Sequence, residues 1–329
     1  QIKGATLAAV CDTDIRKAKD LSRKCNIPYF TTIKEMCKTI DLDLVSVLTQ
    51  SGQHAENVIE LSTLVNNIIV EKPMSLTIKD ADKMIKACDD NRSRLFIVKQ
   101  NRFNKPVQLL RKKIESGELG KLTLGTVRVR WCRRQSYYDQ ASWRGTWKMD
   151  GGVLANQDSH HIDLLEWMLG EPYSVFAYSK NAIASIEAED TAIVVIKFKN
   201  GALGIIEATT ATRPKDLEGS LSILGEKGSV VIGGFATNNL ITYEFDDIES
   251  IDKEFIKEWS TNPPNIYGYG HKAYYEHVVE CINNNESQLV DGREGRKSLL
   301  LINSIYESIQ TGKEVIVGSS TSNSKLGKD

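Results

Sequence analysis

An ionisable pair and a proline, Glu71-Lys72-Pro73, come directly after the apolar run Asn67–Val70. Such a run is typical of a buried strand in a parallel sheet, and open α/β sheets bind ligands at the carboxyl ends of their strands. A lysine at that place can donate to a substrate hydroxyl and stabilise negative charge on its oxygen. A lone lysine is more often an exposed loop residue, but its place at a strand end favours a functional role.

A second reactive group lies at residues 156–163, Asn-Gln-Asp-Ser-His-His-Ile-Asp, between Gly151-Gly152 and an apolar helical stripe. On a helix Asn156 and His160 lie one turn apart, so the amide can orient an imidazole placed for proton transfer. Asp158 and Asp163 are the carboxylates within reach. One histidine of the pair can equally cap or pack. No metal is expected, because adjacent histidines point in different directions and no cluster has zinc spacing.

Aromatic and guanidinium groups are concentrated in a third stretch, which includes Tyr137, Tyr138, Trp143 and Arg144, with Arg130, Arg133 and Arg134 just before it. Arginine grips oxyanions with two hydrogen bonds and aromatic rings stack on sugars or bases, so the stretch suits a phosphorylated or carboxylated sugar. For any single residue, aromatic core or solvated arginine remains an equal alternative.

The order of elements that must position these groups predicts two domains. Up to about residue 98, β-branched runs alternate with amphipathic helices, which is typical of a doubly wound parallel sheet. We expect strands at Thr6–Cys11, Leu44–Thr49, Asn67–Val70 and Leu95–Val98. We expect helices at Asp14–Cys25, Ile33–Thr39, His54–Leu64 and Ile78–Asp90, several of them capped by Thr or Asp.

Longer alternating strands follow and predict a second, α+β domain on a large, mostly antiparallel open sheet. These strands are expected at Leu122–Arg134, Ser174–Tyr178, Thr191–Lys199, Ala202–Thr210 and Gly219–Leu224. The helices are expected at Lys105–Ser116, Asp158–Leu169, Tyr274–Asn283 and Glu294–Thr311. We place the domain boundary between residues 103 and 104, giving a dinucleotide-binding domain at 1–103 and a substrate-binding and oligomerisation domain at 104–329.

The start of the first domain departs from the usual pattern. A dinucleotide-binding domain opens with a strand and a GxGxxG turn that cradles the pyrophosphate, and no such turn is present in the sequence. The first run instead ends at Asp12, in the position of the acid that binds the adenosine ribose at the end of a second strand. We therefore expect the chain to begin at that second strand and to lack roughly 20–30 preceding residues.

Composition excludes several classes of function. The 329 residues carry a formal net charge of −1, so there is no basic field for nucleic acid or an anionic membrane. The six cysteines have no paired spacing, which indicates reduced thiols and a cytoplasmic protein. No run has the length of a membrane helix.

Taken together, these segments resemble the Gfo/Idh/MocA oxidoreductases across nearly the whole chain. Glu71-Lys72-Pro73 resembles that family's signature, and Thr49–His54 resembles its cofactor loop, with Gln50 where proline is usual. Residues 156–163 resemble its DxGxHxxD segment, with Asn156 in place of Asp and Asp158 in place of Gly. The resemblance makes His160, rather than His161, the catalytic histidine.

Within the family, Val98–Asn104, Ser136–Trp147 and Asn156-Gln157 resemble the dehydrogenases of UDP-N-acetyl-2-amino-2-deoxyglucuronate. This resemblance implies NAD-dependent oxidation of the C3 hydroxyl of a UDP-N-acetyl-hexosaminuronate. The 3-keto product would go to a pyridoxal-phosphate aminotransferase for diamino sugars of surface polysaccharide. It also implies a homo-oligomer, a tetramer or dimer, formed through the large sheet.

The resemblance assigns residues to roles. The catalytic residues would be Lys72, His160 and Asn156. The cofactor would contact Asp12, Thr49, Ser51, His54, Glu71, Lys72, Gln100, Trp143 and Arg144. The substrate would contact Lys72, Arg102, Tyr138, Asn156 and His160. Asp12 favours NAD, because a carboxylate repels the 2'-phosphate of NADP, although Arg16 and Lys17 follow closely.

Our mechanistic hypothesis is that His160 removes the hydroxyl proton while Lys72 stabilises the alkoxide, and the opposite division of labour stays open. Alternative substrates are UDP-N-acetylglucosamine, a cyclitol or a free sugar. A non-catalytic NAD-binding subunit or redox sensor is the alternative of a different class, and the joint presence of Lys72 and His160 argues against it.

Overall fold

The structure is a computed structural model that describes residues 2–246, 253–261, 263, 268–319 and 321–328. Three parallel strands, β3 (Val45–Val47), β4 (Asn67–Val70) and β5 (Arg94–Ile97), form the sheet that carries the first predicted site. Helices α3 (His54–Ser62) and α4 (Ile78–Asn91) pack on one face of this sheet. The parallel α/β architecture predicted from the sequence is confirmed.

The other face of this sheet is covered from the far end of the chain. Helix α9 (Gly270–Asn284) packs Tyr274, Val278 and Cys281 against Ile69 and Phe96. Because side chains alternate along a strand, Ile69 faces α9 while its neighbours Ile68 and Val70 face α3 and α4. The run Asn67–Val70 is therefore buried on both faces, which explains why it is continuously apolar.

The first strand is shorter than predicted, and it forms a small separate sheet with a strand that sequence analysis missed. Strands β1 (Val10–Cys11) and β2 (Tyr29–Phe30) pair in parallel, with α1 (Ile15–Cys25) and α2 (Ile33–Thr39) beside them. In the doubly wound order 3-2-1-4-5-6, the two sheets correspond to strands 3-2 and 4-5-6.

The predicted helix caps are present in this domain. The side chains of Asp14, Thr32 and Thr77 accept hydrogen bonds from backbone N–H groups in the first turns of α1, α2 and α4. Each cap satisfies a donor that the helix itself leaves unpaired. The sequence signal for these helix starts was therefore reliable to within a residue.

The second domain is built on an eight-stranded sheet of order β12-β11-β10-β6-β9-β8-β7-β13. Only the β6–β9 pair is parallel among its described pairings. The predicted strands are β6 (Leu122–Arg130), β7 (Pro172–Lys180), β8 (Thr191–Phe198), β9 (Leu203–Thr209) and β10 (Glu218–Gly225). The mostly antiparallel sheet is confirmed.

Sequence analysis missed several elements of this domain. These are β11 (Gly228–Gly233), β12 (Asn239–Phe245), β13 (Val315–Ile316) and the short helices α6 (Gln135–Tyr138) and α8 (Lys253–Glu258). Glycines at both ends of β11 weaken its strand signal, and pairing with β10 and β12 overrides that weakness. The polar tail after Gly318 adds no further strand or helix in the residues described.

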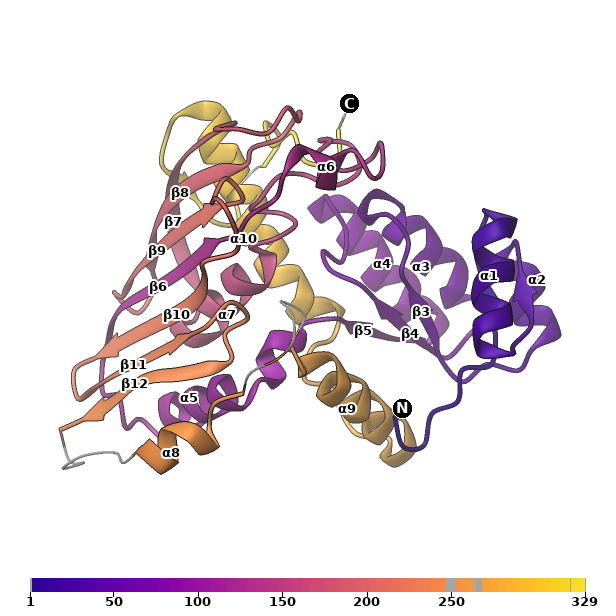
Figure 1. Ribbon diagram of the computed structural model, residues 1–329, viewed down its shortest axis with the longest axis horizontal. Coiled ribbons are helices and arrows are strands. Elements are labelled where there is room, and N and C mark those ends of the chain that lie inside the picture. Colours follow the sequence, from indigo (N-terminus) through magenta and orange to yellow (C-terminus); the bar gives the residue numbers. More distant parts are fainter. Residues whose placement is uncertain (1, 247–252, 262, 264–267, 320, 329) are drawn as a thin grey trace.

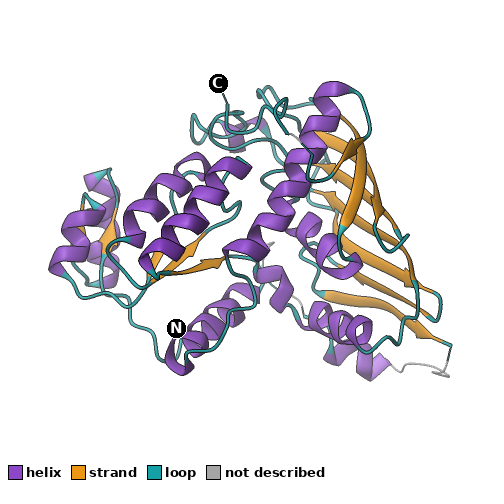
Figure 2. Cartoon of the chain, turned by 180° about the vertical axis from the view of Figure 1, so that it is seen from behind, coloured by secondary structure: helices purple, strands orange, loops and turns teal. Residues whose placement is uncertain are grey.

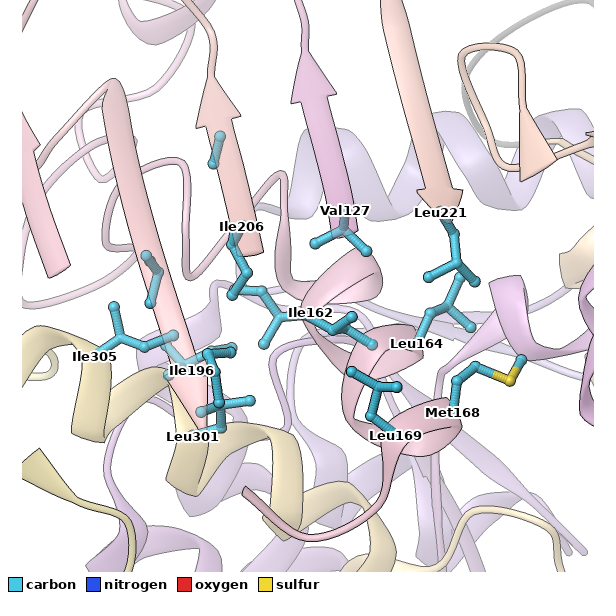
Figure 3. Packing of buried hydrophobic residues seen from close by; sticks show 14 of the residues in the cluster. Val127, Ile162, Leu164, Met168, Leu169, Ile196, Ile206, Leu221, Leu301 and Ile305 are labelled. Carbon is cyan, nitrogen blue, oxygen red and sulfur yellow. The ribbon is translucent and has the colours of Figure 1, made fainter. Parts of the chain in front are cut away.

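The main core lies between the inner face of this sheet and two helices, α7 (Ser159–Leu169) and α10 (Gly292–Thr311). Figure 3 shows apolar side chains of four neighbouring strands pointing at these helices: Val127, Ile196, Ile206 and Leu221 from the sheet, Ile162, Leu164 and Leu169 from α7, and Leu301 and Ile305 from α10. This packing fixes the axis of α7, which begins beside the second predicted site.

The C-terminal helices join the two domains. Helix α10 packs against α7 and β7 in the second domain and against α4 and β5 in the first. Together with α9, it places residues 270–311 partly on the dinucleotide-binding side, as Figure 1 shows. The domain boundary after residue 103 stays a prediction. Residues after this boundary, in α9 and α10, pack against the sheet of the first domain and help to complete it.

The outer face of the large sheet is bare in the part of the chain described here (Figures 1 and 2). Apolar side chains stand on adjacent strands of this face, and the exposed ones are Tyr178, Ile193, Val195, Leu203 and Ile205. Val195 lies directly opposite Ile205, so the group is contiguous. Among the described helices, none is both long and apolar enough for a membrane crossing.

A substitution of Gly152 tests the packing that holds the loop before α7. A Cβ at Gly152 would lie 2.2 Å from the Glu189 carbonyl oxygen. We expect Gly152→Ala to lower the free energy of unfolding by about 3 kcal/mol. Gly117→Ala is the control. Gly117 has a positive φ, but an added Cβ would have no atom within 4 Å, so we expect a loss of about 1 kcal/mol in the free energy of unfolding. Urea denaturation measures both, and equal losses would contradict this account.

Candidate active site

Lys72 leaves the end of β4 and reaches into the second domain. Its Nζ atom donates to the backbone oxygen of Asn156 at 2.8 Å and to the Asn156 side-chain oxygen at 3.0 Å. An ammonium group has three N–H bonds. Two are therefore taken by Asn156, and the third has no hydrogen-bond partner in the described part of the chain.

Asn156 is itself held by a residue that sequence analysis missed. Its Nδ2 atom donates to Asp150 Oδ1 at 2.6 Å, and the Gly145 backbone N–H donates to Asp150 Oδ2 at 2.8 Å. Asp150 is buried. The only sequence signal for it was its place between the Trp143–Trp147 stretch and Gly151-Gly152, which carries no periodicity or motif of its own.

The structure corrects the predicted pairing of Asn156 with His160. Helix α7 begins at Ser159, so Asn156 lies in the preceding turn and its amide faces Lys72 and Asp150. The partner of His160 Nε2 is Gln100 Nε2, at 3.0 Å, from the turn η2 (Gln100–Phe103) after β5. Gln100, which was predicted to contact the cofactor, thus lies against the His160 imidazole.

Lys72 and His160 share one buried neighbourhood, and each disfavours the charge of the other. Burial holds the pKa of His160 well below its usual range, and the charges of Lys72 and Lys99 lower it further. Burial also lowers the pKa of Lys72, against the raising effect of Glu71 and Asp150. The imidazole is therefore neutral at neutral pH, which is the form that can accept a proton.

Arg144 is the arginine of the predicted aromatic stretch that approaches Lys72. Its guanidinium stacks on Tyr137 and Trp143, with 4.3 Å and 5.1 Å from Cζ to the ring centroids, and its charge lowers the pKa of Lys72. Its Nε atom is buried without a hydrogen-bond partner among the residues described. By contrast, Arg130 is paired with Glu207 and Glu218 on the large sheet.

The Thr49–His54 loop lies beside the site, but its histidine points inward. His54 Nδ1 is 2.8 Å from the Pro73 carbonyl oxygen and Nε2 is 3.0 Å from the Thr49 carbonyl oxygen. Burial lowers the pKa of His54. Both ring nitrogens thus face backbone carbonyl oxygens, of which a neutral imidazole donates to only one, and this arrangement argues against a direct cofactor contact through them. The residue instead clamps the loop to the Lys72 strand end, and Ser51 is buried in the same loop.

Arg102 does not face a substrate. Its guanidinium donates to both carboxylate oxygens of Asp163 at 2.7 Å and 2.9 Å and to Glu294 at 2.9 Å, and it stacks on Trp167. The predicted substrate contact is therefore corrected, because a buried guanidinium filled by two carboxylates has no free donor fork. The ion cluster instead ties η2 to α7 and α10.

Three further predicted residues, Tyr138, Glu71 and Asp12, have contacts of their own outside the Lys72–Asn156 hydrogen bonds. Tyr138 is buried, with its hydroxyl 2.9 Å from Thr210 Oγ1. Tyr138 and Arg144 line a cavity of about 430 Å³. Glu71 lies 3.8 Å from His271 and also contacts the Lys72 backbone N–H. Asp12 stands at the end of β1 and accepts from the Asp14 backbone N–H at 2.8 Å.

Three buried polar atoms at this centre lack partners among the described residues: Gln100 Oε1, Arg144 Nε and His160 Nδ1. Buried polar groups are normally hydrogen-bonded, so these unpartnered groups fit a polar ligand here: Gln100 contacts His160, and Arg144 is close enough for its charge to act on Lys72. The described residues contain no group of three His, Cys, Asp or Glu side chains that could hold a metal. The fold and site therefore define a dinucleotide-dependent oxidoreductase with a lysine and a histidine at its centre.

Comparison with known families agrees with this class. Residues 1–99 match the family described as "Oxidoreductase family, NAD-binding Rossmann fold" and residues 111–317 match "Oxidoreductase family, C-terminal alpha/beta domain". The chain belongs to the Gfo/Idh/MocA oxidoreductase family, and its cofactor is NAD. Among curated relatives, it is 22% identical to D-apiose dehydrogenase of Rhizobium rhizogenes and 24% identical to myo-inositol 2-dehydrogenase of Thermotoga maritima. These alignments cover 96% and 95% of this chain and 92% of each relative.

Two solved structures are more similar in sequence. The WlbA dehydrogenase of Bordetella pertussis, in complex with NADH and UDP-GlcNAcA, is 39% identical over 96% of this chain and 91% of its own, with a TM-score of 0.91. The WlbA dehydrogenase of Chromobacterium violaceum, with the same two ligands, is 40% identical over 96% and 89%, with a TM-score of 0.89. Lys72, Asn156 and His160 therefore lie in a fold shared with two dehydrogenases that were solved with NADH and UDP-GlcNAcA.

The ion cluster around Arg102 generates a prediction about stability and pH. Burial and the nearby charge of Asp163 raise the pKa of Glu166 from 4.5 to about 8. A raised folded-state pKa gives stability that is complete below 4.5 and is lost as pH rises to about 8. We expect the melting temperature of Glu166→Gln to rise relative to that of the wild type as pH increases from 4.5 to about 8, by about 5 °C at the upper end.

Melting curves at intervals of pH measure this difference. The exposed Glu280 on α9 supplies the control, and Glu280→Gln should follow the wild type throughout. A melting-temperature difference between Glu166→Gln and the wild type that does not change with pH would mean that Glu166 is ionised in the folded protein as it is in the unfolded chain.

Proposed function

We propose that this protein oxidises the C3 hydroxyl of a UDP-N-acetyl-hexosaminuronate to a 3-keto sugar nucleotide, with NAD as oxidant. The observation that carries the proposal is the third N–H of Lys72, which no described residue accepts, near a neutral His160, with the Arg144 guanidinium, whose Nε has no partner among the described residues, at the same centre. The two structures at 39% and 40% identity, both solved in complex with UDP-GlcNAcA, support the substrate class.

The chain's own residues account for the proton transfer. Lys72 donates its remaining N–H to the sugar hydroxyl and stabilises the negative charge that grows on this oxygen. His160, whose imidazole is held neutral by burial, then accepts the hydroxyl proton at Nε2, in place of the hydrogen bond that this nitrogen accepts from Gln100. NAD, when bound, accepts the hydride from the carbon that carries this hydroxyl.

The residues that would hold NAD lie at strand ends of the first domain. We assign Asp12 to the adenosine ribose and the backbone around Thr49, Ser51 and Glu71 to the region beside Lys72. Trp143 and Arg144 would approach the cofactor from the second domain. Arg144 is placed for an anionic group, since its guanidinium stacks on aromatic rings and Nε has no partner in the described residues.

The wider context of the reaction is also part of the proposal. A 3-keto sugar nucleotide is a substrate for a pyridoxal-phosphate aminotransferase, whose product would enter surface polysaccharide synthesis. We place the enzyme in the cytoplasm, where its six cysteines, all free in the structure, stay reduced. The apolar outer sheet face around Val195 and Ile205 supports a homo-oligomer, a dimer or tetramer, because exposed apolar patches mark association surfaces.

Turnover of a substrate panel tests the proposed function. With UDP-N-acetylglucosaminuronic acid and NAD, we expect Lys72→Met and His160→Asn each to lower kcat about 100-fold or more. Lys79→Met, which removes an exposed lysine on α4, should keep wild-type turnover. The absorbance of reduced nicotinamide reports the rate. Normal turnover in both site variants would end this mechanism.

The same panel separates the alternatives. It includes UDP-N-acetylglucosamine, myo-inositol and glucose, because curated relatives act on free sugars and cyclitols according to their names. Preference for one of these compounds would replace the uronate proposal and leave the Lys72–His160 chemistry intact. Absence of turnover with all of them, while NAD still raises the melting temperature, would favour a non-catalytic NAD-binding subunit.

Asp12 generates a separate prediction about cofactor choice. A carboxylate pairs with two free ribose hydroxyls and repels a 2'-phosphate, so NAD should raise the melting temperature more than NADP does. Asp12→Ser should narrow that difference. Asp20→Ser, which removes an exposed carboxylate further along α1, should leave it unchanged. A larger rise with NADP in the wild type would assign the phosphate to Arg16 and Lys17 instead.

A further inference from the structure

Asp150 has two well-defined contacts and no part in the mechanism described above. It comes from the loop before Gly151-Gly152 and only 1% of its surface is exposed. Asn156 Nδ2 donates to one carboxylate oxygen and the Gly145 backbone N–H to the other. Both oxygens act as acceptors, so the ionised carboxylate is the form that satisfies this geometry.

These contacts leave one orientation for the Asn156 amide. A carboxylate can only accept hydrogen bonds and an ammonium can only donate them. The amide must therefore present its NH₂ to Asp150 and its oxygen to Lys72. The reverse orientation would bring two donors together on one side and two acceptors together on the other. Asp150 thus determines which amide atom faces the lysine.

We propose that Asp150 is a positioning residue of the reaction: its carboxylate locks the Asn156 amide so that Lys72 Nζ keeps two oxygen acceptors and aims its third N–H at the substrate hydroxyl. The inference rests on the proposed function for the identity of that hydroxyl. The Lys72–Asn156–Asp150 contacts themselves are geometric and do not depend on which sugar is bound.

Asp150 also supplies charge at this centre. The charged groups whose fields reach Lys72 include the carboxylates of Glu71 and Asp150 and the cations of Lys99 and Arg144. His160 also lies within reach of the Lys72 charge, but its imidazole is neutral. Without Asp150, one carboxylate would face two cations, which disfavours a third positive charge on Lys72.

The same carboxylate connects Lys72 to the loop that carries Arg144. Gly145, whose N–H it accepts, follows Arg144 directly and has a φ of 70°. A Cβ at Gly145 would lie 2.8 Å from Ile186, so the loop has little room to shift. Asp150 therefore fixes a lysine from the first domain and an arginine of the second relative to one another.

Exchanging the two side chains gives a matched test. In Asp150→Asn alone, the oxygen of the new amide can accept from the Gly145 N–H, and its NH₂ then faces the Asn156 amide. If Asn156 keeps its orientation, two NH₂ groups meet. If Asn156 turns over, its own NH₂ faces the Lys72 ammonium. In the double variant Asp150→Asn with Asn156→Asp, the new amide accepts from Gly145 and donates to the new carboxylate. That carboxylate accepts from Lys72, so every hydrogen bond is restored.

The first measurement needs no turnover. Lysine labelled with ¹³C at Cε gives a signal that titrates with Nζ, and comparison with Lys72→Met assigns it. We expect Asp150→Asn to move the Lys72 titration to lower pH and the double variant to return it to the wild-type pH or above. Asp90→Asn, which removes an exposed carboxylate 2.8 Å from Lys86, should leave it in place.

The second measurement is the pH profile with NAD and UDP-N-acetylglucosaminuronic acid. We expect Asp150→Asn to lower kcat about tenfold or more with KM changed less than about threefold, and to move the Lys72 limb to lower pH. The double variant should recover kcat to within about threefold of the wild type. If Asp150 had only a structural role, its substitution would lower the melting temperature and leave unchanged the pH at which kcat falls through the titration of Lys72.

An unmoved Lys72 titration in Asp150→Asn overturns the proposal, and so does a double variant that titrates at lower pH than the wild type. The double variant decides the question even if the single variant does not fold, since its carboxylate contacts Lys72 directly. If the wild type turns over no sugar in the panel, the proposed function fails, while the Lys72 titration still decides the role of Asp150.

Discussion

The structure depends on holding a lysine ammonium where two domains meet, largely shielded from water. Burial alone disfavours the charge, so it must be offset by placed acceptors and counter-charges. Lys72 comes from the end of β4, but both oxygen acceptors come from Asn156, 84 residues later in the chain. Separation of the two domains would remove both acceptors at once, so the proposed role of Lys72 requires that the domains are docked.

Docking is enforced by buried charge as well as by apolar packing. Arg102, beside the Gln100 that touches His160, is locked to Asp163 on α7 and Glu294 on α10. Breaking a buried pair of this kind typically costs about 3–5 kcal/mol. Because Asp163 lies one turn after His160, the same ion pair sets the rotation of α7 and hence the position of the imidazole. The charged cluster behind the site therefore performs a positional role that a solvent-exposed pair could not.

Sequence reasoning found the groups that patterns mark and missed those that only contacts mark. Lys72 follows a strand, and His160 lies at the start of a helix. The fold of both domains followed from strand and helix periodicity. Arg102 was misassigned because an arginine near a strand end has the same signal whether it meets a ligand or a carboxylate. His54 was misassigned because sequence cannot show that both ring nitrogens meet carbonyl oxygens. Asp150 had no signal, since its importance depends on a fold that brings residue 72 to residue 156.

The buried acids near α7 show how the same polypeptide keeps neighbouring carboxylates in different states. Asp163 receives two donors from Arg102, and these outweigh burial and lower its pKa. Glu166, one turn further on, has an oxygen without a described partner, and burial raises its pKa to about 8. One negative charge in this cluster is therefore balanced by arginine while the other is suppressed by protonation. Protonation of Glu166 thus leaves Asp163 as the ionised carboxylate between Arg102 and Lys99, both of which it contacts.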